Sequence, residues 1–493
     1  MPRPLRLASA GVLLAGPTVL AFFSGGYFGV IHGQVGVLVA ALAWLLAAAV
    51  ILFEPRPFPS SKAGLVALGG LTAFVAWSAL SLLWSPLRDP GLADVERSAL
   101  YLAAFLVGCS ALRGAATARA VAPALLAGIA IVCLYALSTR LLPGIVDSTS
   151  GFRAGSRLDQ PLTYWNALGA LASMGLMLAI GTASDPRRSE RFRVAAMALL
   201  PALGLTLYLT ISRGAHVAAV LGAVVLVLAA RNRRAVDSTL LGFAAVALMA
   251  GTAGRFHGVV ELDGGVGTQE RQGLAVLGLL VVISTLAAVG QLLLARLESR
   301  GTTWTAALRR RPALIAGVAV VALAAVALGV AAFAGGQAKP SPRDSLATGP
   351  ERFRTLETNR WHYWRVAFDS FADEPLTGSG IHGFAADWLK RRDIDEGVQD
   401  AHSLYIETLT ELGLPGLLFL GLFLGGVGLA LWRAGEPGWI AASAVWAIHA
   451  GVDWDWEMPA LTLVFIALAA AATATAASTQ RAGSAANLNR VTP

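Results

Sequence analysis

The sequence has little charge and almost no cysteine. Only 14% of its 493 residues are Asp, Glu, Lys or Arg, whereas the share in soluble globular proteins is about 25%. The two cysteines, Cys109 and Cys133, lie in separate apolar runs, which gives neither a disulfide framework nor metal-ligand spacing. The net charge of +8 comes from arginines in short loops between apolar runs. That distribution is typical of membrane orientation signals and argues against a nucleic-acid partner.

Several enzyme motifs are also missing. There is no glycine-rich phosphate loop, no Cys-x-x-Cys pair and no Gly-x-Ser-x-Gly elbow, so the sequence does not point to P-loop, dithiol-redox or serine-hydrolase chemistry. His449 and Asp453 are spaced like a metal-binding pair, but no third ligand stands near them in the sequence. We therefore expect neither a metal nor a cofactor.

Long apolar runs are what the sequence does have, because 56% of its residues are hydrophobic. Runs of about 20 residues can each cross a hydrocarbon core about 30 Å thick. We predict an all-α polytopic membrane protein with about 12–14 transmembrane helices. The first run follows MPRPLR, and we interpret it as a retained signal anchor because a second run follows at once. The predicted runs are 7–26, 34–53, 64–84, 97–112, 119–142, 164–183, 194–211, 215–230, 237–254, 273–295, 312–335, 403–432, 437–452 and 457–478.

Basic loops set the expected orientation. Arginine-rich loops alternate with loops that have few arginines, and the basic ones are 186–193, 231–235 and 295–311. The positive-inside rule places these loops and both termini in the cytoplasm. Segment 143–163, the turn Ser212-Arg213-Gly214 and the long loop 336–402 are then extracytoplasmic.

The long loop contains a predicted amphipathic helix. Trp361, Trp364, Phe368 and Phe371 recur at helical spacing in RWHYWRVAFDSFADEPLTG. One interpretation is an interfacial helix anchored by its tryptophans at headgroup level. Another is a lid over a lipid-linked substrate, and the two interpretations are compatible.

Arg213 is the first candidate for chemistry. It lies between two apolar runs, where an arginine costs a few kcal/mol unless it reaches the interface or an anionic partner. The alternatives are a snorkelling arginine and a guanidinium that binds phosphate or carboxylate with two hydrogen bonds. The N-terminus of the following helix would add partial positive charge to an anion site.

His402 is the second candidate. It stands in DAHSLYIETLTELGLPG, where Asp400 is the predicted N-cap of a helix that enters the membrane. Glu407 and Glu411 follow on one face of that helix, and carboxylates so placed are expected to face an interior cavity. A structural histidine is the alternative, but an imidazole titrates near neutral pH and suits proton transfer.

The segment GVDWDWEMPALT (451–462) puts three acids and two tryptophans beside the last apolar run. Aromatic faces and carboxylates often bind sugars, so the segment has two interpretations. It is either part of an acceptor groove or an aromatic belt with solvated acids.

Together these blocks resemble the O-antigen ligase and polymerase superfamily. The resemblance covers residues 150–435, in an order that matches the family: a Ser-Arg-Gly turn, a Trp-containing helix before Pro-Leu-Thr-Gly-x-Gly, and a His-Asn/Ser opening with a Glu-x-Gly-x-x-Gly close. Ser403 stands where the family commonly has Asn. The residues that carry the resemblance are Arg157, Pro161, Asn166, Ser212 to Gly214, Trp364, Pro375 to Gly380, His402, Ser403, Glu411, Gly413 and Gly416.

The resemblance implies a GT-C-type membrane architecture whose long loop caps an external cavity. It implies transfer of a saccharide from a polyprenyl-diphosphate-linked donor to a glycan, lipid or protein acceptor hydroxyl, in the cell (inner or plasma) membrane. His402 would be the base and Arg213 would stabilise the diphosphate. The supporting residues would be Glu407, Glu411, Trp364, Arg157, Arg360 and Arg365.

The predicted domains follow from this. Residues 1–150 form N-terminal membrane helices, 151–435 the catalytic region, 436–480 the C-terminal helices and 481–493 a disordered tail. Two other classes remain open, a transporter or lipid-linked oligosaccharide flippase and a non-catalytic assembly protein. Transporters usually show internal repeats and charges near the midplane, whereas here the polar residues gather at the predicted outer face.

Overall fold

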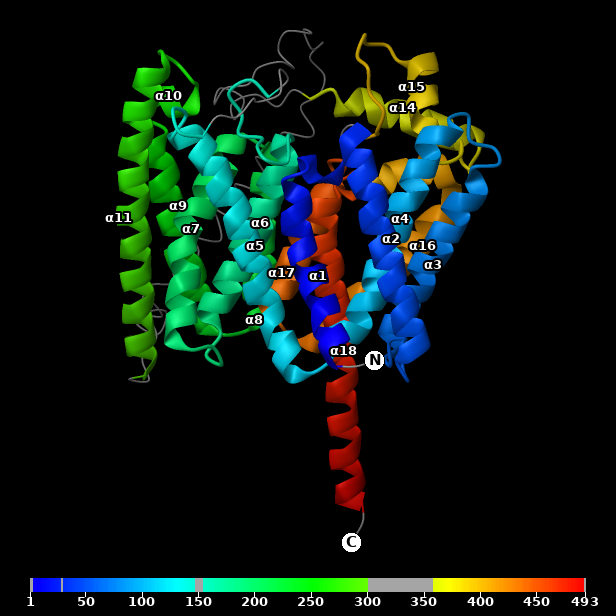
Figure 1. Ribbon diagram of the computed structural model, residues 1–493, viewed down its shortest axis with the longest axis horizontal. Helices are drawn as coiled ribbons and strands as arrows, with labels where there is room; N and C mark the ends of the chain where they lie inside the picture. The colour runs from blue at the N-terminus through cyan, green and yellow to red at the C-terminus, as the bar shows by residue number, and fades with distance from the viewer. Residues whose placement is uncertain (1–2, 28–29, 147–153, 300–357, 492–493) are drawn as a thin grey trace. The chain divides into compact units, whose positions relative to one another are not determined.

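The computed structural model describes residues 3–27, 30–146, 154–299 and 358–491 (Figure 1), and in those ranges it contains helices and no strand. The chain divides into two compact units, neither continuous in sequence. The first unit comprises Met1–Ala124, Asn359–Gly435 and Ala450–Pro493. The second comprises Leu125–Thr358 and Glu436–His449.

Long helices dominate the first unit, with two shorter ones, α14 and α15, at one end of them (Figure 1). In this unit α16 packs against α3 and α18, and α4 packs against α1, α2 and α18. A Cβ on Gly70 of α3 would lie 2.5 Å from the backbone nitrogen of Phe423 of α16, so the two backbones meet with no room for a side chain. The elements are α1 (Arg3–Ala21), η1 (Ser24–Gly26), α2 (Val30–Phe53), α3 (Lys62–Ser81), α4 (Arg88–Ala111), α14 (Arg360–Asp373), α15 (Gly383–Arg391), α16 (Leu404–Ala434), η4 (Asp455–Glu457) and α18 (Pro459–Val491).

The second unit is built around α6. This helix packs against α7, α8 and α9, and 94% of its apolar window is buried. A Cβ on Gly181 of α6 would lie 2.6 Å from the Cα of Gly438 of α17, another close approach that depends on glycine. The elements are α5 (Ala115–Leu141), α6 (Trp165–Ser184), α7 (Glu190–Thr210), α8 (Arg213–Ala230), α9 (Arg233–Ala253), α10 (His257–Val260), α11 (Val266–Ser299) and α17 (Pro437–Ala450).

The predicted fold class is confirmed. Within the described ranges, 9 helices are long and apolar enough to cross a membrane, and every predicted run except 312–335 coincides with a helix. That run lies outside the described residues. The helix α18 continues through residues 481–491, the segment for which the sequence predicts a disordered tail.

The helix predicted in the long loop is present as α14, and two of the four aromatics of its stripe are exposed, while Trp364 packs against the protein. Trp361 is 62% exposed and Phe368 48% exposed. The opposite face packs against α15 and the segment before α16, in a small core of Tyr363, Val366, Ala367, Phe384, Trp388 and Ala401. Exposed aromatics on one side of a short amphipathic helix are compatible with the interfacial interpretation.

Candidate functional site

His402 stands immediately before α16, in a strained backbone conformation. Its φ of 55° lies in the left-handed region, which costs a residue other than glycine free energy and is often seen at functional sites. The predicted N-cap was wrong: Ser403, not Asp400, caps α16 by accepting the amide of Ile406 at 3.4 Å. Aspartate and serine are both strong capping residues, and DAHS offers one of each.

The contacts of the His402 ring select its tautomer. Nδ1 lies 3.0 Å from the main-chain carbonyl oxygen of Asp400. Because a carbonyl can only accept, the neutral ring carries its proton on Nδ1 and keeps a lone pair on Nε2. The ring is half-buried, 5.2 Å from the ring of Tyr363 and 6.3 Å from that of Trp454, measured between centroids. Oriented in this way, His402 can accept a proton at Nε2.

Three carboxylates gather beside His402. Ligand oxygens of Asp400, Glu407 and Glu457 all lie within 4.8 Å of one another. Glu407 accepts the amide of Ala401 at 2.6 Å, and Asp400 contacts the hydroxyl of Tyr27 at 3.5 Å. Burial raises the pKa of Asp400, and burial with the nearby acids raises the pKa of Glu457 to about 8. Glu457 is therefore largely protonated at neutral pH.

This spacing is compatible with a divalent cation, and within the described ranges no other group of acids, histidines and cysteines has it. A shared proton relieves the same repulsion between neighbouring carboxylates. A cluster of acids does not by itself select between them, so the expected absence of a metal stays a prediction.

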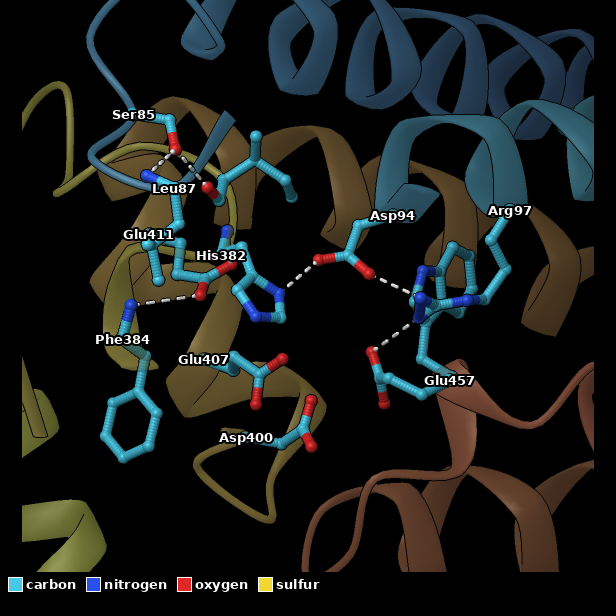
Figure 2. Close-up of polar contacts among 12 residues, drawn as sticks. Ser85, Leu87, Asp94, Arg97, His382, Phe384, Asp400, Glu407, Glu411 and Glu457 are labelled. Atoms are coloured by element: carbon cyan, nitrogen blue, oxygen red, sulfur yellow. Dashed lines mark hydrogen bonds and ion pairs between the residues drawn. The ribbon is translucent and has the colours of Figure 1, made fainter. Parts of the chain in front are cut away.

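A second histidine, His382, joins three elements of the first unit (Figure 2). Its Nδ1 lies 2.8 Å from Asp94 of α4, and its amide donates to Glu411 of α16 at 2.9 Å. Glu411 also accepts the amide of Phe384 at 3.1 Å. Asp94 in turn pairs with Arg97, which lies 3.7 Å from Glu457. The network thus reaches the carboxylates beside His402.

The charge of His382 follows from these neighbours. Burial alone would lower its pKa, but the hydrogen bond and charge of Asp94 outweigh burial. With smaller contributions from Glu411 and Asp400, the pKa of His382 rises to about 9. The ring is therefore an imidazolium at neutral pH.

The sequence interpretation missed both partners of this pair. Asp94 precedes an apolar run and looks like an ordinary headgroup charge, while His382 stands 288 residues further along. One signal was available, since His382 interrupts the glycine-rich stretch Gly378-Ser-Gly380-Ile-His-Gly383.

The loop residues predicted to bind substrate differ in their surroundings. Arg360 pairs with the fully buried Asp453 at 2.7 Å. Trp364 donates from Nε1 to the carbonyl of Ala401 at 3.1 Å, next to His402. Arg365 pairs at 2.8 Å with Asp393 on the surface, where its side chain is 45% exposed. Arg360 and Trp364 therefore connect to the His402 region more directly than Arg365 does.

The two remaining predicted residues belong to the second unit. Arg213 is the first residue of α8 and half-buried, and Ser212 caps this helix by accepting the amide of Ala215 at 3.4 Å. Arg157 is 4% exposed, donates from Nε to the carbonyl of Ala154 at 3.0 Å, and holds its guanidinium 3.6 Å from the ring centroid of Trp165. Arg213 lies where helix geometry favours an anion.

Comparison with protein families identifies the region that contains His402. Residues 262–421 match the family model described as O-antigen ligase. The matched segment includes α11, α14, α15 and the first part of α16, and both His382 and His402 lie in it. No curated protein sequence matches the chain. The match supports the predicted resemblance to the O-antigen ligase and polymerase superfamily and, with the apolar helices around it, is consistent with a part in membrane glycan assembly.

Proposed function

We propose that the protein transfers a saccharide from a polyprenyl-diphosphate-linked donor to an acceptor hydroxyl, without a metal or cofactor. The observation that carries the proposal is the orientation of His402. Its Nδ1 faces the Asp400 carbonyl, so Nε2 has the free lone pair, within a segment that matches O-antigen ligases. The acceptor is a glycan, a lipid or a protein, and membrane lipids surround the site.

The proposed reaction is a displacement at the anomeric carbon. The acceptor hydroxyl gives its proton to Nε2 of His402 as its oxygen bonds to the anomeric carbon of the donor. The bond from that carbon to the diphosphate oxygen breaks, and the polyprenyl diphosphate leaves with the electron pair. The proton on His402 then passes to solvent.

The leaving diphosphate needs positive charge that acts most strongly as the bond breaks. We assign this role to Arg213, because a half-buried guanidinium at a helix N-terminus combines a fixed charge with the partial positive charge of the helix end. Arg157 is the second candidate in the same unit, and Arg360 and Arg365 are the candidates on the loop.

Glu407, Glu411 and Trp364 are proposed to hold the site together. Glu407 and Trp364 contact the amide and the carbonyl of Ala401, the residue before His402. Glu411 accepts two amides from the turn around His382. These contacts fix the residue before the base and the turn around His382, and a positioned general base needs such support.

We further propose that the reaction occurs on the extracytoplasmic face of the cell (inner or plasma) membrane, with both termini in the cytoplasm. The support is that arginine-rich short loops alternate along the sequence with loops that have few arginines, so that the basic loops all fall on one side, as the positive-inside rule requires.

The direct test is reconstitution of the purified protein in liposomes with undecaprenyl-diphosphate oligosaccharide. Lipid-core, glycan and protein acceptors are supplied separately, and products are followed by gel shift and mass spectrometry. Transfer by the wild type, lost in His402→Ala at equal insertion, supports the proposal. Movement of intact lipid-linked glycan across the bilayer without transfer to any acceptor would instead establish a flippase.

A further inference from the structure

We propose that His382, paired with Asp94, is a positioning residue of the transfer site, required for turnover in addition to His402. The inference rests on the proposed function and adds a residue to it. It is carried by three features of the molecule, namely the backbone conformation of His382, the bonds that hold its turn, and the charges around its ring.

The backbone at residue 382 suits glycine better than histidine. His382 has φ 60°, in the left-handed region, and Gly378 and Gly380 in the same loop have φ values of 64° and 87°. Glycine adopts such values without steric cost, whereas a side chain is strained there. A histidine kept at this position therefore needs a contribution from its ring that outweighs the strain.

Holding the turn does not require the ring. The amides of His382 and Phe384 donate to Glu411 at 2.9 and 3.1 Å. On the other side, the amide of Ile381 donates to Ser81 at 3.0 Å, and its carbonyl accepts from Ser85 at 2.7 Å. All four bonds use the backbone of the turn, so a glycine at position 382 would keep them.

The ring instead supplies positive charge to a group of acids. Asp94 of α4, Glu411 of α16 and Asp400 of the segment before α16 are the acids that act on His382. Arg97 of α4 faces Asp94 from its other side. In Figure 2 the second ring nitrogen of His382 lies on the side of Glu407 and Asp400, away from Asp94.

Asp400 connects this charge to the base. The carboxylate of Asp400 interacts electrostatically with both His382 and His402, and the carbonyl of Asp400 lies against Nδ1 of His402. Without the imidazolium, Asp94, Glu411 and Asp400 lose one of the cations that act on them and keep Arg97, so the buried carboxylates take up protons more readily. The charge and geometry of the segment that orients His402 then change.

The test compares His382→Gly with wild type in the liposome transfer assay. We expect His382→Gly to remain folded and inserted, because relief of the backbone strain offsets part of the lost ion pair with Asp94. We expect its kcat at pH 7 to be at least tenfold lower, with the KM for the lipid-linked donor within twofold. The matched control is His362→Ala, which removes another His–Asp pair (2.8 Å to Asp393, on the surface) and should leave kcat within twofold.

Asp94→Asn supplies a second readout that a purely structural role would not move. If the imidazolium is required, wild-type turnover falls as pH rises through about 9, the pKa of His382. Removing the charge of Asp94 lowers that pKa, so the alkaline limb of the profile moves toward neutral pH. The fall of turnover at alkaline pH can be measured in Asp94→Asn whether or not His382→Gly folds.

The outcomes separate this inference from the function on which it rests. Absence of transfer by the wild type overturns both. Transfer by the wild type with equal kcat in His382→Gly overturns the role of His382 alone, as does an alkaline limb that stays in place in Asp94→Asn. A lower kcat in His382→Gly with retained stability, together with the shifted limb, establishes the role.

Discussion

The acids of the first unit and the arginines of the second have different surroundings. In the first unit, Asp400, Glu407 and Glu457 crowd together beside His402 and are partly neutralised by protons and by nearby cations. In the second, Arg157 is held by a carbonyl and an aromatic ring, and Arg213 opens a helix. A cluster of acids suits the handling of protons, while fixed guanidinium groups suit an anion. We therefore assign proton handling to residues of the first unit and anion binding to residues of the second.

The largest expected effect comes from removing the base. His402→Ala should lower kcat by roughly 10²- to 10⁴-fold, the usual contribution of a positioned general base. Binding of the lipid-linked donor should persist, because the diphosphate contacts are proposed for arginines and not for His402. The measurement is turnover in liposomes together with donor binding by fluorescence quenching. A variant that loses donor binding and turnover in parallel would break the division of roles between the units.

Arg213 should show the complementary pattern. Arg213→Ala should lower kcat/KM by roughly 10²-fold, comparable to the loss of one donor that stabilises a developing negative charge. Arg213→Lys keeps the charge but not the two-pronged hydrogen bonding, so it should recover only part of the loss. Donor binding and turnover are measured for both variants at one protein density. Equal activity of the lysine and alanine variants would show that charge at this position does not matter.

The sequence was sufficient for the spans because the bilayer imposes a simple rule. Within the described ranges, each predicted apolar run coincides with a helix, and α16 has a break at Gly413, where φ is 63°. His402 and Glu411 could be proposed from the sequence because they lie in one short motif, and their roles stay predictions. The sequence did not predict the pair of Asp94 and His382, because packing of α4 against a turn far along the chain brings the two residues together. The spacing of residues in the sequence does not indicate that Asp94 and His382 contact each other.

A smaller effect is expected from the residue that supports the base. Glu407 accepts the amide of Ala401, and an unpartnered buried amide costs about 1–3 kcal/mol. Glu407→Ala should therefore lower kcat about tenfold, since about 1.4 kcal/mol corresponds to one factor of ten. Glu407→Gln keeps an acceptor oxygen and serves as the control, with kcat expected close to wild type. If the glutamine variant were as impaired as the alanine variant, the charge of Glu407 and not its hydrogen bond would be the essential feature.

The smallest effect should come from replacing Trp165, whose ring contacts the guanidinium of Arg157. Trp165→Leu removes the aromatic face 3.6 Å from the guanidinium carbon, and a cation–π contact contributes about 0.5–2 kcal/mol. The bond from Arg157 Nε to Ala154 remains, so the arginine keeps one anchor while losing part of its orientation. We expect the lost free energy of the cation–π contact to lie near the lower end of that range. Since RT is about 0.6 kcal/mol, this loss raises the KM for the donor about threefold and leaves kcat unchanged. Trp165→Phe keeps an aromatic face and should stay closer to wild type. A fall in kcat at constant KM in Trp165→Leu would show that Trp165 and Arg157 act in the chemical step and not in donor binding.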